Sequence, residues 1–196
     1  MSKAVLIVLI ALSVNVFSSD VLIQELSGAT YEYSYNGEIV ATVKHDNPRS
    51  TRDQPALMAN CMVHYIGQDA GDEARYTTYG AVEIYCGKKK IIIVKPNETN
   101  IFGGIRLESP DRKWAIFLPD NDSSVPRFSI LTESGELISR EFGLFSLVLF
   151  SDEKATIDNT KAVVFGMARA APKYGSKMVK SKVVILPDGS FSFTAE

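Results

Sequence analysis

The sequence predicts an all-β protein, a single-domain antiparallel sandwich or barrel of about ten short strands behind a cleaved signal peptide. Short runs rich in Val, Ile, Tyr, Phe and Thr are interrupted by Gly, Pro, Asn or Asp roughly every 8 to 15 residues. No stretch after the N-terminal segment keeps a long helical period. Several neighbouring runs are joined by residues typical of β-hairpin turns.

Residues 1–18 have the order of a secretory signal peptide. Lys3 precedes an apolar run over residues 4–17, and small residues follow, with the best cleavage site after Ser18. The run is shorter than the about 20 residues that a spanning helix needs, which favours cleavage over an uncleaved anchor. We therefore expect residues 19–196 to form one β-rich domain that is secreted or periplasmic, with no transmembrane segment in the mature chain.

Composition excludes several classes of protein. The chain has 196 residues, of which 45% are hydrophobic, so it is long and apolar enough to bury a core. Its formal net charge of −2 gives no overall field to attract nucleic acid. We expect no nucleic-acid partner and no wholesale disorder.

Cys61 and Cys86 are the two cysteines of the chain. In an oxidising compartment, two cysteines in one domain most simply pair with each other, whereas the alternative is two buried free thiols. We expect a disulfide that crosslinks two strands and contributes about 3–4 kcal/mol on the chain-entropy model. It would do no chemistry.

The first predicted hairpin, residues 31–43, turns at Asn36-Gly37, which is a strong signal for a tight turn. Face matching fixes strand register. A three-residue, bulged loop pairs Tyr33 with Ile39 and brings the apolar side chains to one face, whereas a two-residue turn separates them. We therefore expect the bulged loop.

The last predicted hairpin, residues 183–193, turns at residues 187–189, Pro-Asp-Gly. Pro and Asp suit a type I turn, and Gly suits the left-handed position that follows it. This loop pairs Ile185 with Phe191, so we expect the C-terminal segment to be a strand of the sheet.

The middle predicted hairpin, residues 81–94, turns at Gly87-Lys88. Its second strand contains a run of apolar β-prone residues at 91–94, which is typical of a strand buried on both faces. The weakest strand prediction is the segment 55–66, which also has the composition of a short helix. Further strands are expected at residues 21–25, 101–107, 113–118, 127–131, 136–141, 144–150 and 161–169.

Residues that catalysis and metal binding need are sparse. The chain has two histidines, His45 and His64, and neighbours on a strand point to opposite faces, so neither His45-Asp46 nor Cys61-x-x-His64 forms a site in a strand. The acidic loop at residues 120–124 lacks the glycine and glutamate spacing of an EF-hand. Nucleotide-binding and nucleophile-elbow motifs are absent from the sequence. We assign no catalytic, cofactor-binding or metal-binding residue, and no cofactor.

Lysines make the C-terminal segment locally basic. Strand alternation places Lys180 and Lys182 on one face, with Met178 beside them. A basic face suits an anionic partner such as a polysaccharide or a lipid headgroup. The interpretation that we favour is an edge strand that lysines protect against aggregation.

Tyrosines supply amphipathic aromatic surface. Exposed tyrosines suit sugar or protein contacts, whereas buried ones belong to the core. The register of the first hairpin favours burial of Tyr31 and Tyr33. Tyr35, Tyr76 and Tyr79 remain as candidate contact residues, together with Lys180 and Lys182.

The sequence leaves the biological function and the source open. Asn97 and Asn121 begin glycosylation sequons, which are modified only in a eukaryotic source. We interpret the chain as an exported, non-catalytic β-scaffold that binds a protein, an envelope component, a glycan or a small ligand. The alternatives are a carboxylate-dependent hydrolase of glycosidase type, which needs two facing carboxylates in a cleft, and a structural component of an envelope or matrix.

Overall fold

The computed structural model describes residues 21–26, 29–44, 55–68, 78–93, 105–118, 126–143, 145–150, 154–170 and 178–195. Within these ranges the regular elements are β-strands, and paired strands run antiparallel. No helix in the described part is long and apolar enough to cross a membrane. The all-β prediction is confirmed, and the predicted signal peptide lies outside the described residues.

The strands form four sheets that follow one another along the chain. The first sheet contains β1 (Val21–Glu25), β2 (Thr30–Tyr35) and β3 (Glu38–Lys44). The second contains β4 (Ala56–Met58), β5 (Cys61–Gln68), β6 (Thr78–Cys86) and β7 (Lys89–Ile93). The third contains β8 (Arg106–Glu108), β9 (Trp114–Phe117), β10 (Arg127–Thr132) and β11 (Leu137–Glu141). The fourth contains β12 (Phe145–Phe150), β14 (Ala162–Ala170), β15 (Met178–Ile185) and β16 (Phe191–Ala195), with the short β13 (Thr156–Ile157) paired to β14.

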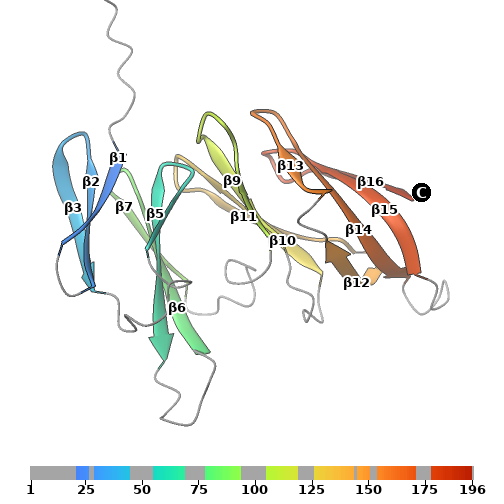
Figure 1. Ribbon diagram of the computed structural model, residues 1–196, viewed down its shortest axis with the longest axis horizontal. Coiled ribbons are helices and arrows are strands. Elements are labelled where there is room, and N and C mark those ends of the chain that lie inside the picture. Colours follow the sequence, from blue (N-terminus) through green and yellow to red (C-terminus); the bar gives the residue numbers. More distant parts are fainter. Residues whose placement is uncertain are drawn as a thin grey trace, which may run out of the picture.

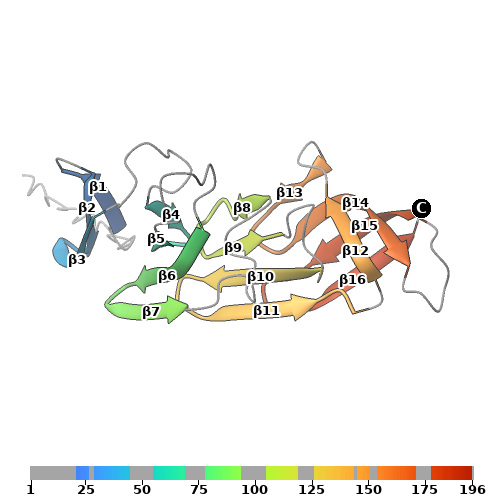
Figure 2. The same cartoon turned by 90° about the horizontal axis from the view of Figure 1, so that it is seen from below.

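The sheets are arranged as a series. Figures 1 and 2 show them side by side in chain order, with the first sheet at one end and the fourth sheet at the other. Each described sheet has open edges, so the described strands do not close a barrel. The described part contains four sheets, whereas a β-sandwich has two. The described chain has sixteen strands rather than the expected ten or so, partly because short strands such as β4 and β13 add to the sheets.

The second sheet is buried on both faces. Side chains alternate along a strand, so Cys61, Val63 and Tyr65 of β5 pack toward the third sheet. Met62, between them, joins Tyr85 of β6 in the cluster that the first sheet covers. The tyrosines of β2 complete that cluster, and the predicted burial of Tyr31 and Tyr33 is confirmed.

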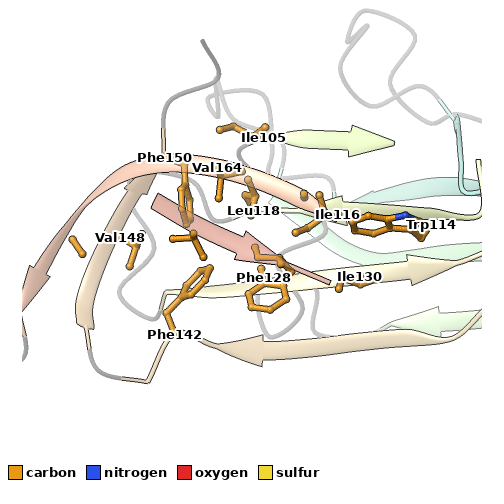
Figure 3. Packing of buried hydrophobic residues seen from close by; sticks show 14 residues of the cluster. Ile105, Trp114, Ile116, Leu118, Phe128, Ile130, Phe142, Val148, Phe150 and Val164 are labelled. Atoms are coloured by element: carbon orange, nitrogen blue, oxygen red, sulfur yellow. The ribbon is translucent and has the colours of Figure 1, made fainter. Parts of the chain in front are cut away.

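The third sheet is also buried on both faces. In β9, Ala115 and Phe117 pack toward the second sheet, whereas Trp114 and Ile116 pack toward the fourth. Figure 3 shows this last cluster, in which Trp114, Ile116 and Phe128 of the third sheet meet Val164 of the fourth. Hydrophobic burial between successive sheets therefore holds the series together.

The first hairpin differs from its predicted register. Asn36 and Gly37 both have positive φ, 51° and 76°, as a two-residue turn of type I′ requires. The extra residue lies within the strand instead, because Ser34 pairs with Ile39 and Tyr33 pairs with Ala41. The expected three-residue loop is wrong: a β-bulge inside β3 places Ala41 and Val43 beside the tyrosines but leaves Ile39 on the opposite, exposed face.

The last hairpin has its predicted register. Ile185 pairs with Phe191, and Gly189 has a φ of 80°. Asp188 stabilises the turn, because its carboxylate accepts hydrogen bonds from Ser190 N at 2.9 Å and Ser190 Oγ at 2.6 Å. The C-terminal segment is therefore a strand of the sheet, as expected.

The structure corrects one expectation for the second sheet and decides another, which the sequence left open. The strand β7 is an edge strand and not one buried on both faces, because it pairs only with β6 and leaves Ile92 56% exposed. The segment 55–66, which the sequence left between strand and helix, forms β4 and the first part of β5.

Candidate functional site

The fourth sheet presents one face to the third sheet and the other face outward. Its inner side chains belong to the cluster shared with the third sheet, among them Ala162, Val164 and Ile185. We name the opposite side the fourth-sheet outer face and define it by Phe165, Met167, Met178, Lys180 and Lys182. In this face Met167 is 44% exposed and Met178 is 39% exposed.

Strand pairing assembles this face. Phe165 lies opposite Lys182, and Met167 lies opposite Lys180, across the pair formed by β14 and β15. The ammonium group of Lys182 lies 6.0 Å from the centre of the Phe165 ring. Apolar and basic side chains therefore alternate on one face of the sheet.

The strand that carries the two lysines, β15, lies between β14 and β16 in the sheet order. Lys182 pairs with Thr194 of β16, so the edge-strand interpretation is wrong for Lys182. The described pairing with β16 begins at Ser181 and does not reach Lys180. The predicted alternation is confirmed, because Met178, Lys180 and Lys182 are all exposed while Ser181 and Val183 are buried.

Residue sizes on β14 are the reverse of those on an ordinary half-buried strand. The inner side carries Ala162, Val164, Gly166 and Ala168, of which Gly166 is only partly buried, whereas the outer side carries Val163, Phe165 and Met167. The small residues let neighbouring elements approach closely: an added Cβ on Gly166 would lie 2.4 Å from the carbonyl oxygen of Leu149. The large apolar side chains are thus placed where they are not needed for the core.

The charge of this face has one sign. The strands β12, β14, β15 and β16 contain no Asp or Glu, so no carboxylate from these strands neutralises Lys180 and Lys182. The segment that joins β14 to β15 adds Lys173 and Lys177 to the sequence nearby. Chemically, this surface offers ammonium donors for acidic groups and apolar contacts beside them.

A second cluster of polar side chains lies on the second sheet and centres on Glu83. The ammonium group of Lys90 lies 2.5 Å from Glu83 Oε1, and the hydroxyl of Tyr85 donates to Oε2 at 3.0 Å. His64, buried beside them, places Nδ1 3.5 Å from Oε2. The cluster links the adjacent strands β5, β6 and β7.

Electrostatics within this cluster favour the charged carboxylate. Burial by itself raises the pKa of Glu83, but the hydrogen bonds from Lys90 and Tyr85, the charge of Lys90 and the nearby His64 outweigh it and leave the pKa below its ordinary value. Hydrogen bonding to Glu83 and Tyr85 raises the pKa of Lys90. An ionised, fully engaged carboxylate is a poor general acid or base at neutral pH, so we assign this cluster a structural role.

The predicted contact residues fall in different places. Lys180 and Lys182 come together on the fourth-sheet outer face, as described above. Tyr35 lies in the first sheet, where its ring packs near Gly87 of the second sheet. Tyr79 belongs to β6, opposite Gly67, and Tyr76 lies outside the described residues. Of the described candidates, Tyr35 and the two lysines therefore lie on different sheets.

The predicted disulfide is present. Cys61 and Cys86 face each other across β5 and β6, with their Cα atoms 4.4 Å apart. The bond crosslinks two strands, as expected, and is compatible with an oxidising extracellular compartment. Among the described residues, no group of three His, Cys, Asp or Glu side chains is placed to hold a metal ion. His45, the loop 120–124 and both sequons lie outside the described residues.

Comparisons with known proteins give no identification. No protein-family model, no curated protein and no solved structure matches this chain.

Sequence reasoning missed Phe165 and Met167 as surface residues. Both faces of β14 are apolar in the sequence, which is also the pattern of a strand buried on both sides. The signal that distinguishes the two cases is size, because residues 162, 164, 166 and 168 on one face are Ala, Val, Gly and Ala, whereas the other face carries Phe165 and Met167.

Proposed function

We propose that this chain is an exported, non-enzymatic β-scaffold, processed after residue 18 and folded as one domain, that binds a partner protein through the fourth-sheet outer face. The partner surface is apolar with carboxylates between the apolar side chains. The signal-like N-terminus supports export, and the Cys61–Cys86 disulfide is compatible with an oxidising extracellular compartment.

The observation that carries this proposal is the inverted size pattern of β14. Half-buried Phe165 and exposed Met167, with exposed Met178 beside them, form an apolar strip, and monomeric proteins rarely leave such strips uncovered without a use. Lys180 and Lys182 sit within the strip, so a partner must supply negative charge as well as apolar surface.

A protein suits this surface better than a polyanion alone. A polysaccharide or nucleic acid is bound mainly through charge, and this face has two lysines among apolar side chains instead of a basic cluster. Methionine side chains adapt to the shape of apolar partner surfaces. The expected contact is therefore mixed, with apolar contacts for affinity and lysines for orientation.

Site-specific photocrosslinking in the native host tests the proposal. A photoreactive residue replaces Lys182 in one version and Lys113, an exposed turn residue of the third sheet, in a control version. We expect a discrete crosslinked protein from position 182 and none from position 113. The purified partner should bind the double variant K180E/K182E about tenfold or more weakly than the unmodified chain.

Other outcomes contradict the proposal. Equal crosslinking from both positions would mean that the outer face has no special role. Binding to vesicles of anionic phospholipid that K180E/K182E abolishes, without any protein crosslink, would assign the face to a membrane surface instead.

A further inference from the structure

The last hairpin of each of the four sheets has the same feature, a turn glycine. Each of these hairpins contains a glycine with positive φ, namely Gly37, Gly87, Gly135 and Gly189. In sequence these turns share little beyond the glycine, so the repeat is visible only in the structure.

Each hairpin glycine after the first lies against the preceding sheet. An added Cβ on Gly87 would meet the Tyr35 ring at 3.7 Å, and one on Gly135 would meet Cys86 Cβ at 3.0 Å. One on Gly189 would meet Ile138 Cγ2 at 2.8 Å. Successive sheets therefore approach one another at equivalent positions, as the units of a repeat protein do.

The first hairpin is the exception. Around Gly37 no atom lies within 4 Å of an added Cβ, apart from the glycine and its chain neighbours. Among the described residues no sheet precedes the first one, so the contact that its hairpin would make is left open there.

Exposed apolar side chains gather at the two ends of the series. Of the large hydrophobic residues exposed in the described part, all but Ile92 belong to the first or the fourth sheet or to residues beside them. Leu22 and Ile39, both adjacent to Ser34 in the strand pairing, lie on the outer side of the first sheet, 55% and 59% exposed. Met167 and Met178 lie on the outer side of the fourth.

Charge distinguishes the pairings that these faces permit. Two fourth-sheet outer faces would bring Lys180 and Lys182 of each copy together, which costs energy. The outer side of the first sheet carries Glu32 near Leu22 and Ile39, with Lys44 at its margin. Glu32 lies between Gln24 and Thr42, one position along the same face from the apolar pair Leu22 and Ile39, so this side offers a carboxylate next to apolar side chains, as the fourth-sheet outer face requires.

We propose that the partner is a second copy of this chain, whose first sheet stacks on the fourth-sheet outer face. This inference rests on the proposed function and names its partner. The contact is head to tail. In a pair of copies, one copy therefore keeps a free fourth-sheet outer face and the other keeps a free first-sheet face. It continues the series of sheets from chain to chain and produces a filament, or a ring where the rotation closes.

Two complementary variants test this contact by sedimentation of the secreted protein. L22E/I39E blocks the first-sheet face, and M178E/K182E blocks the fourth-sheet face. All the substituted residues are exposed, so both variants should keep the unfolding temperature of the unmodified protein within a few degrees. We expect the unmodified protein to form species larger than a dimer as its concentration rises, and each variant alone to remain a monomer.

Mixing the two variants gives the decisive result. Each retains one intact face, so a mixture should form a complex of two chains and nothing larger. An unmodified protein that stays a monomer at every concentration overturns the inference, as does a dimer that either variant preserves by itself.

A cysteine pair gives a measurement that does not depend on the charged variants. Leu22→Cys and Met178→Cys in one chain should yield a ladder of crosslinked chains under mild oxidation. A crosslinked monomer would mean that the two ends meet within one chain, which overturns the inference.

The two proposals fail in different ways. If the protein stays monomeric while position 182 still crosslinks to another protein, the self-association is wrong and the binding face stands. If the fourth-sheet variants change neither self-association nor crosslinking, the binding face itself is wrong.

Discussion

Gly135, in the last hairpin of the third sheet, lies directly against Cys86 at the end of β6. An added Cβ would come within 3.0 Å of Cys86 Cβ and 3.2 Å of its Sγ. Gly135 also has a φ of 75°, which other L-amino acids adopt at a cost. Two separate requirements, backbone conformation and close approach of a neighbouring sheet, therefore meet at one residue.

Substitution of Gly135 by alanine should separate these requirements when it is compared with Gly37→Ala. Gly37 has nearly the same φ, 76°, but nothing within 4 Å of an added Cβ. We expect Gly37→Ala to lower the free energy of unfolding by about 1 kcal/mol through backbone strain alone. Gly135→Ala should lower it by about 2–3 kcal/mol because the second and third sheets must also move apart.

Urea unfolding of both variants measures the difference. Equal losses would show that Gly135 is needed only for its backbone conformation, and that the two sheets do not approach each other at this position.

Removal of the disulfide should destabilise the fold without altering the strand pairing. The bond closes a loop with a sequence separation of 25, for which the chain-entropy model gives about 3 kcal/mol. We expect the double variant Cys61→Ala/Cys86→Ala to unfold at a correspondingly lower urea concentration while its far-ultraviolet spectrum at zero urea stays that of a β protein. An unchanged midpoint would mean that the disulfide does not stabilise the fold.

Processing of the N-terminus is testable by intact mass. We expect the exported protein to begin at Ser19, since a short apolar run followed by small residues is typical of a cleaved signal. Its mass should also be lower by two protons than that of the reduced form, because Cys61 and Cys86 are joined. A full-length N-terminus would contradict the cleavage. A mass that does not change on reduction would contradict the disulfide.

Local structure was predictable where short-range chemistry decides it. The Pro-Asp-Gly turn fixed the pairing of Ile185 with Phe191, because the loop length and the left-handed glycine permit one register. For the first hairpin, the register and the face of Ile39 were not predictable, because a bulge in β3 keeps Ala41 and Val43 with the tyrosines and turns Ile39 to the exposed face.

Arrangement between sheets was not predictable from the same patterns. The run at 91–94 reads as a doubly buried strand, yet Ile92 is exposed at a sheet edge, because burial depends on which sheet lies alongside. The sequence also predicts an edge position for the strand that carries Lys180 and Lys182, because it does not show that β14 lies on the other side of β15 from β16. Lys180 and Lys182 were found by alternation, whereas Phe165 and Met167 needed the position of the third sheet to reveal which side of β14 is buried.

Acid should weaken the protein through Glu83, whose folded-state pKa lies below its ordinary value of 4.5. Because the unfolded chain binds the proton more tightly, the ionised Glu83 stabilises the fold above about pH 4.5, and this contribution is lost as the pH falls through the lower folded-state pKa. Glu83→Gln removes the charge that Lys90 contacts. At neutral pH we expect the variant to lose about 1–2 kcal/mol of unfolding free energy, and the loss should disappear in acid.

Glu38→Gln is the matched control for this prediction. Glu38 pairs with Lys88 at 2.6 Å, but both side chains are more than 60% exposed, so solvent screens the pair. We expect Glu38→Gln to change the unfolding free energy by less than about 0.5 kcal/mol at neutral pH. Unfolding curves at a series of pH values measure both variants. The prediction is contradicted if Glu83→Gln and Glu38→Gln change the unfolding free energy equally at every pH. The charge of Glu83 would then be as well solvated as that of Glu38, and the Glu83 cluster would not stabilise the contact between β5, β6 and β7.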